Sequence, residues 1–261
     1  MAPDPPTNVG ALANRAVAAG LSPAVVAKWG SRPRSGFSIC CGAPSVGRPE
    51  IPASTATLFD LASLTKPLAT TVLTLKAIGT GNLRLSTRSD EVLGRLRGTP
   101  AGERTVGQML THTGGFPAWL PLYCLTEGDP GSVVSSLGSL ELRPAGVEVV
   151  YSCLGFIVLG RVIEELANLR LDALFRNEIS APLGLEKEIG YCPDPGDHRL
   201  AGGSLNPAVE RGMVHELGFD PSFFPPTEAG MPDDGNARFL GGISGNAGLF
   251  GSAEAVSRLA L

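Results

Sequence analysis

One predicted helix, from about Ala62 to Ile78, constrains this chain more than any other segment. Glycines follow its last residue. Pro67 is tolerated only near a helix start, because deeper in a helix its ring would clash with the preceding turn. The proline therefore sets the beginning of the helix close to Ser63. Residues three positions apart share one face of a helix, so the Lys66 amine is expected to reach the Ser63 hydroxyl.

This Ser-x-x-Lys pair has the chemistry of a nucleophile and its base. A free serine hydroxyl is a poor nucleophile, and an adjacent unprotonated amine activates it. The same spacing arises by chance on solvated helices, where a lysine usually has acidic residues four positions away. Lys66 instead has Ala62 and Thr70 there. Burial would favour the neutral amine, and the helix dipole near Ser63 would favour developing negative charge. We therefore interpret the pair as catalytic.

The composition predicts a soluble globular protein with a single domain over residues 1–261. The chain is 43% apolar and 18% charged, which supplies ample core material. Its net charge of −4 and the lack of a basic stripe argue against nucleic-acid binding. The longest apolar run is too short to cross a membrane, and the first residues do not resemble a secretory signal. We expect neither a nucleic-acid nor a membrane partner, and the oligomeric state stays open.

The cysteines and histidines predict neither disulfides nor a metal site. The five cysteines are odd in number, scattered and without a Cys-x-x-Cys pair, which favours free, buried thiols in a reducing, cytoplasmic setting. Cys40 and Cys41 are adjacent and should point to opposite faces of a strand. The three histidines, at positions 112, 198 and 215, lack the spacing of metal ligands. We expect no metal and no cofactor.

Residues 8–57 are predicted to form one helix and two sheet strands. Asn8 can cap an amphipathic helix that Gly20 ends. Residues 23–29 and 36–41 have the composition of strands, and the turn-rich residues between them predict an antiparallel hairpin.

The rest of the chain is predicted to be helical first and irregular later, in an α+β fold. Within residues 58–190, apolar spacing predicts further helices at 106–111, 154–169 and 171–179, with a loop at 128–139. Residues 191–261 are expected to be irregular from 192 to 234, then Gly-rich, and finally helical after a cap at Ser252. That last helix has no ending signal, so we expect the domain to be incomplete at the C-terminus.

Four motifs, in order along the chain, resemble the β-lactamase-related serine hydrolase superfamily. It holds class C β-lactamases, penicillin-binding proteins, D-aminopeptidases and β-lactamase-fold esterases. The motifs are the Ser-x-x-Lys segment at 58–66, a His-Thr-Gly-Gly turn at 110–117, a Tyr-Ser-Cys segment at 151–160 and a Gly-rich segment at 247–253. The resemblance implies an antiparallel sheet flanked by helices, a mainly helical subdomain, and missing C-terminal strands.

The resemblance also implies roles for single residues. Ser63 matches the acylated nucleophile and Lys66 its base, and Tyr151 matches the tyrosine that relays a proton to the leaving group. Without the resemblance, Tyr151 would be an ordinary interface tyrosine. Trp119 falls where the family lines its substrate pocket, although simple packing explains it equally well. For Asn246 there are two interpretations. It is either a polar loop residue near the substrate or, as the favoured interpretation, a turn residue with positive φ.

His112 resembles a residue of the family's turn, so we expect it to have a structural, hydrogen-bonded role rather than to act as a general base.

Two features depart from the family pattern. Cys153, also placed at the substrate site, stands where the family usually has Asn or Asp to orient the lysine, and a thiol is a weak hydrogen-bonding group. A third motif, Lys/His-Thr/Ser-Gly on a sheet strand, is not identifiable at a suitable place before the last residue. In the family it supplies one of two oxyanion-hole donors, and losing one such donor costs about 100- to 1000-fold in rate.

Two hypotheses for function follow. The first is a serine hydrolase that forms an acyl-enzyme on Ser63 with small ester or amide substrates, including β-lactams or D-amino-acid peptides. The alternative is a catalytically impaired or incomplete member that binds a ligand or partner. A Ser-His-Asp α/β-hydrolase is disfavoured, because the segment at 242–246 breaks the Gly-x-Ser-x-Gly motif.

Overall fold

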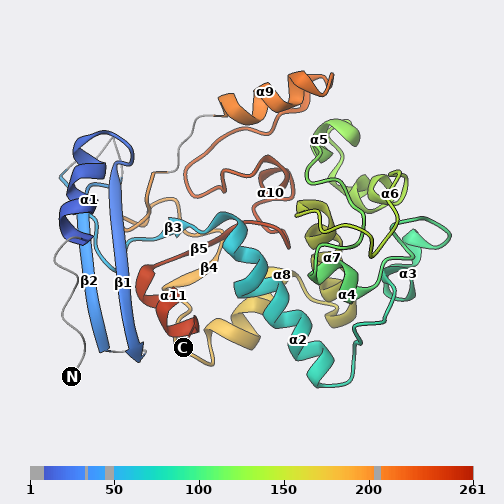
Figure 1. The fold of residues 1–261 in the computed structure, drawn as a ribbon, viewed down its shortest axis with the longest axis horizontal. Coiled ribbons are helices and arrows are strands. Elements are labelled where there is room, and N and C mark those ends of the chain that lie inside the picture. The colour runs from blue at the N-terminus through green and yellow to red at the C-terminus, as the bar shows by residue number, and fades with distance from the viewer. Residues whose placement is uncertain (1–8, 33–34, 45–49, 203–206, 261) are drawn as a thin grey trace.

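The computed structural model describes residues 9–32, 35–44, 50–202 and 207–260, with a long hairpin at one end and most helices at the other (Figure 1). β1 (Ala24–Arg32) and β2 (Ser35–Gly42) pair antiparallel, with Val25 opposite Cys41. α1 (Val9–Ala18) packs against β2. The predicted helix and hairpin are confirmed over the described residues, which leave out Asn8.

A second, smaller sheet joins three distant parts of the chain. Its order is β3 (Phe59–Asp60), β5 (Leu249–Gly251), β4 (Ile189–Tyr191), and both pairings are antiparallel. β5 is buried along its whole length. Because β3 immediately precedes the nucleophile segment, this sheet brings the Gly-rich segment beside it. These three short strands were not predicted from residue spacing.

The nucleophile helix has the predicted extent but three different geometries. It begins as the 3₁₀ turn η1 (Ala62–Leu64), continues as the π-helical η2 (Lys66–Thr71) and ends as α2 (Val72–Gly79). Pro67 is near the start of η2 and has no N–H to donate, so the regular α-helical hydrogen bonding begins only after it. The serine and the lysine therefore lie in the tight and wide turns that precede the α-helix.

The hydrophobic core is built around α7 (Cys153–Ala167). Leucine, isoleucine, valine and phenylalanine side chains of this helix are buried from Leu154 to Ile163. α4 (Val106–Leu110) and α3 (Ser89–Val92) pack against it. The Ser152 hydroxyl accepts hydrogen bonds from two N–H groups of its first turn, as an N-cap does.

Two segments predicted to be irregular contain helices. The loop expected at 128–139 holds η4 (Pro130–Ser132) and α6 (Val133–Gly138), whose Val133 and Leu137 are both buried. The excursion expected at 192–234 holds α9 (Ala208–Glu216) and η6 (Pro221–Phe223). These predictions were wrong because short helices depend on the apolar side chains that they bury elsewhere, not on local propensity.

The other predicted helices are confirmed. The remaining helical elements of the described chain are η3 (Gly94–Leu96), α5 (Leu122–Leu125), α8 (Leu171–Phe175), η5 (Arg176–Ser180), α10 (Gly235–Phe239) and α11 (Ala253–Ala260). Ser252 caps α11 by accepting from the Ala255 N–H. No helix in the described part of the chain is long and apolar enough to cross a membrane.

The five cysteines are free thiols, as expected, but most of them are not buried. Cys124 alone is fully buried, whereas Cys40 and Cys192 are exposed. Cys41 and Cys153 are half-buried, and the difference between Cys40 and Cys41 agrees with opposite faces of β2. Among the described residues, no group of three or more histidine, cysteine or acidic side chains could hold a metal ion.

Candidate active site

The predicted nucleophile and base are in contact. Lys66 Nζ donates to Ser63 Oγ across 2.9 Å. Lys66 is only 2% exposed, whereas Ser63 is half-buried beside an open cavity. The amine also donates to the main-chain oxygen of Asn246 at 3.0 Å and approaches Cys153 Sγ at 3.5 Å. The lysine is thus held from three sides with its amine directed at the hydroxyl.

The ring of Tyr151, rather than its hydroxyl, is the part that lies near the Ser63–Lys66 pair. Lys66 Nζ is 5.0 Å from the centre of the Tyr151 ring, within the range of a cation–π contact. Tyr151 is 54% exposed, and its hydroxyl makes no hydrogen bond to the residues that the structure describes. The structure places this residue at the site, and the proton-relay role stays a prediction.

His112 is a structural residue of the site. It has the left-handed φ of 58°, and its Nδ1 accepts a hydrogen bond from the Ser152 N–H at 3.0 Å. The centre of its ring lies 4.6 Å from that of Tyr151, with the two ring planes tilted by 42°. Burial, and then the nearby Lys66 charge, lower the pKa of His112 below its usual range. The neutral imidazole acts as an acceptor that fixes the backbone next to Tyr151, in agreement with the structural role expected.

Asn246 lies at the site but not in the predicted conformation. It does not have a positive φ, and Gly248, two residues later, has the φ of 113° instead. Asn246 is fully buried, and its side chain accepts from Ser244 Oγ at 2.7 Å and donates to Asp234 Oδ2 at 3.0 Å. The prediction of a left-handed turn residue was wrong because these two hydrogen bonds, not a tight turn, account for the amide side chain.

Cys153 occupies the first position of α7, facing the lysine. Burial raises the pKa of its thiol, against the opposing effect of the Lys66 charge. A neutral thiol at 3.5 Å is a weak partner for the amine. Most of the orientation of Lys66 therefore comes from the carbonyl of Asn246.

The cavity at Ser63 has a volume of about 510 Å³. Its wall is largely apolar and comes from three separate segments of the chain. The lining residues are Leu61, Ser63, Leu64, Lys66, Pro67, Thr71, Leu110, His112, Tyr151 and Phe156. A cavity of this size beside a nucleophile can hold a small organic substrate.

Trp119 lines a different cavity, of about 390 Å³, together with Glu210, Asp234 and Arg238. The tryptophan also packs against the small core around the buried Tyr123. The structure therefore separates Trp119 from the cavity at Ser63, and a role in substrate binding stays a prediction. Asp234 was not predicted as a site residue, because its only local signal was that of a helix cap before Gly235.

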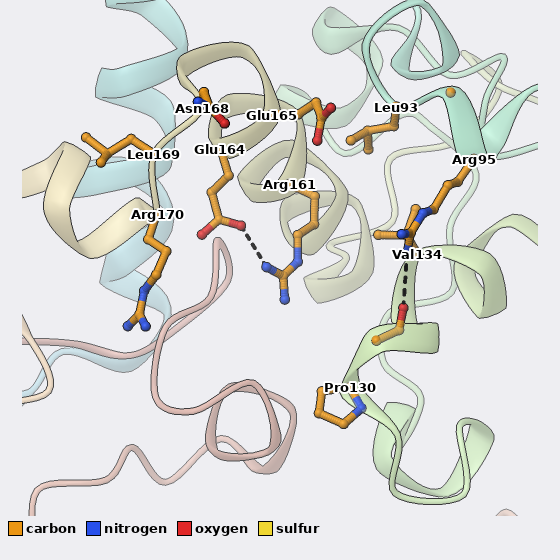
Figure 2. A pocket seen from close by; sticks show the side chains of 12 residues that line it. Leu93, Arg95, Pro130, Val134, Arg161, Glu164, Glu165, Asn168, Leu169 and Arg170 are labelled. Atoms are coloured by element: carbon orange, nitrogen blue, oxygen red, sulfur yellow. Dashed lines mark hydrogen bonds and ion pairs between the residues drawn. The ribbon is translucent and has the colours of Figure 1, made fainter.

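A third cavity, of about 830 Å³, lies away from the nucleophile (Figure 2). It shares no lining residue with the cavity at Ser63. Figure 2 shows Arg161 paired with Glu164, at 2.7 Å, on its wall. Arg170, on the same wall, is paired with Asp172. These ion pairs neutralise most of the charge of the cavity, and no nucleophile faces it.

Comparison with known proteins shows the family. The family model described as Beta-lactamase matches residues 24–261. The chain belongs to the Beta-lactamase family. This is a family of serine hydrolases, as the motifs predicted.

One relative is similar in sequence to this Beta-lactamase family member over most of the chain. The chain is 28% identical over 253 residues to a putative D-alanyl-D-alanine carboxypeptidase of Escherichia coli strain K12. The match covers 88% of this chain and 55% of that protein, so the chain spans about half the length of this relative.

Solved structures share the Beta-lactamase fold. A class C β-lactamase from Rhodobacter sphaeroides has a TM-score of 0.71 and 24% identity, covering 97% of this chain and 64% of that one. EstCE1, a hydrolase with promiscuous acyltransferase activity, has a TM-score of 0.71 and 22% identity, covering 95% of this chain and 69% of that one. The predicted α+β, β-lactamase-like fold class is confirmed.

Proposed function

We propose that the protein is a serine hydrolase that forms an acyl-enzyme on Ser63. The observation that carries this proposal is the buried Lys66 amine, 2.9 Å from the Ser63 hydroxyl. Its other contacts, Asn246 O at 3.0 Å and Cys153 Sγ at 3.5 Å, hold it in place. Such a pair matches a nucleophile and an adjacent base.

The reaction begins when the neutral Lys66 amine takes the proton of Ser63 Oγ. The Oγ–carbon bond to the substrate carbonyl forms, and the bond from that carbon to the leaving oxygen or nitrogen breaks. The leaving group takes up a proton through the exposed Tyr151 hydroxyl. Water then hydrolyses the acyl-enzyme and restores both side chains.

The substrates we propose are small esters or amides, with β-lactams and D-amino-acid peptides among them. The cavity of about 510 Å³ with its largely apolar wall supports a small substrate. The likeness to a putative carboxypeptidase and to class C β-lactamases supports the two peptide-like classes. The free cysteines support a cytoplasmic location.

A fluorophosphonate probe tests the proposal directly. It should label the wild-type chain at Ser63, and Ser63→Ala should abolish the labelling. Lys66→Met should slow it by about 100- to 10,000-fold, because it removes the general base while keeping side-chain length. Lys76→Met is the matched control, since Lys76 is half-exposed on the same helix and paired with Glu178. Labelling that persists in Ser63→Ala would contradict the assignment.

A ligand- or partner-binding module is the second candidate, and Cys153 at the lysine favours it. It would be supported if the wild-type chain bound a β-lactam reversibly, by calorimetry, while neither hydrolysing p-nitrophenyl acetate nor reacting with the fluorophosphonate.

A further inference from the structure

We infer that Asp234 is a positioning residue that fixes the Lys66 amine through the side chain of Asn246. This inference rests on the proposed function. It concerns a residue of the 191–261 region that lies more than 160 positions along the chain from the lysine.

The lysine has one strong anchor besides the serine that it activates. The carbonyl of Asn246 accepts from Nζ at 3.0 Å inside the core, where neither residue is solvated. The thiol of Cys153, at 3.5 Å, is a poor substitute for the amide or carboxylate of the family pattern. The direction of the Asn246 carbonyl therefore decides where the amine points.

The side chain of Asn246 is held at both ends. Its Oδ1 accepts from the Ser244 hydroxyl at 2.7 Å, and its Nδ2 donates to Asp234 Oδ2 at 3.0 Å. The first bond comes from the same loop and moves with it. The second comes from a different segment and ties the residue to a fixed point. Because the amide is planar and pinned on two sides, it restrains the main chain that carries the carbonyl.

Asp234 is itself rigid. Its second oxygen, Oδ1, accepts from the Ala237 N–H at 2.8 Å and caps α10, whose residues 235–238 are buried. Its carboxylate also adds to the raised pKa of the Cys153 thiol, as expected if it lies close to the lysine anchor. One carboxylate thus joins a helix end to the loop that orients the base.

The neighbouring Asp233 offers a matched comparison. It is exposed, and its hydrogen bonds are made by its backbone: the N–H donates to Asp60 Oδ2 at 2.8 Å and the carbonyl accepts from Arg238 at 2.6 Å. Asp233→Asn therefore removes the same charge nearby without touching Asn246. In Asp234→Asn, a side chain that keeps its oxygen on the Ala237 N–H turns an NH₂ group toward the Asn246 amide. The present hydrogen bond from Asn246 Nδ2 is then lost, or the Asn246 amide must turn over and give up its present contact with Ser244.

The test measures hydrolysis of p-nitrophenyl acetate and fluorophosphonate labelling in four proteins. We expect Asp234→Asn to lower kcat by about tenfold with KM nearly unchanged, the loss of about one hydrogen bond to a charged group. Asp233→Asn should match wild type. The pair Asp234→Asn with Asn246→Asp exchanges donor and acceptor, restores the contacts among Ala237, residue 234, residue 246 and Ser244, and should restore most of kcat.

Rescue by the exchanged pair distinguishes positioning from general destabilisation. The inference is overturned if Asp234→Asn behaves like Asp233→Asn, or if the exchanged pair is no faster than Asp234→Asn alone. If wild type does not react at all, the proposed function fails. The inference is then decided by a crystal structure of Asp234→Asn, in which the Asn246 carbonyl must have turned away from the amine. An unchanged contact would refute it.

Discussion

The key residues of the active site lie in an environment unlike that of the same residue types on the protein surface. Lys66 is among the few charged side chains of the described chain that are nearly inaccessible, and an apolar ring and a backbone carbonyl face it where water would otherwise lie. Protein atoms rather than water therefore fix the direction of the amine toward Ser63 Oγ.

The pH dependence of folding should report on His112. Its pKa in the folded protein is lowered from the ordinary 6.5, first by burial and then by Lys66. The folded state therefore binds fewer protons than the unfolded state as the pH falls below that value, and stability is lost. The stabilising contribution of neutral His112 is expected to be complete above pH 6.5. It should decrease as the pH falls toward the lower pKa that His112 has in the folded protein.

His112→Asn tests this sign. Asparagine tolerates the left-handed φ and can keep an acceptor for the Ser152 N–H, but it does not titrate in this range. Urea denaturation from pH 7.5 to 5.5 should show a smaller loss of unfolding free energy in the variant than in wild type. The other two histidines are present in both proteins, so their contribution cancels. Equal losses would mean that His112 is not the titrating group.

At the scale of elements, the site depends on how closely a loop approaches α7. A Cβ on Gly245 would lie 2.1 Å from the Phe156 carbonyl and 3.0 Å from the backbone of Gly160. The Thr70 hydroxyl donates to the Gly245 carbonyl at 2.7 Å from the other side. The loop is therefore clamped between η2 and α7, one residue before the carbonyl that holds Lys66.

Gly245→Ala should open this clamp. The added methyl group must push the loop from α7, which we expect to cost about 1–3 kcal/mol of unfolding free energy, as overpacking does. Fluorophosphonate labelling should slow as well, because Asn246 moves with its neighbour. Gly190→Ala in β4 is the control, since a Cβ there meets no atom within 4 Å. Thermal denaturation and labelling rates measure both effects, and a stable, fully reactive Gly245→Ala would contradict the clamp.

At the scale of the whole molecule, the hairpin is joined to the rest of the fold by α11 (Figure 1). Lys28 of β1 forms an ion pair with Glu254 in the first turn of α11. The two side chains are 13% and 34% exposed, so the pair is shielded from solvent more than a surface pair. The hairpin and the small sheet share no strand, which makes this contact a principal link between them.

Lys28→Met should loosen the hairpin without changing the site. We expect a loss of about 1–2 kcal/mol, between the values for exposed and fully buried pairs. Amide hydrogen exchange should rise in β1 and β2, while labelling of Ser63 stays unchanged. Glu148→Gln, which breaks the exposed pair with Arg143, should cost little and is the control. Slower labelling in Lys28→Met would show instead that the hairpin supports the active site.

The sequence by itself determined the features that depend on neighbouring residues. The helix near Ser63, the reach of Lys66 to its hydroxyl, the N-terminal hairpin and α7 all follow from spacing over a few positions, and the motifs pointed to the family. Helix α6 and the small sheet required buried partners far along the chain, and spacing cannot reveal these. The hydrogen bond from Lys66 to the carbonyl of Asn246 could not be predicted either, because a main-chain carbonyl carries no sequence signature. Only the tertiary structure, by bringing Asn246 and Asp234 to the lysine, decided how the base is held.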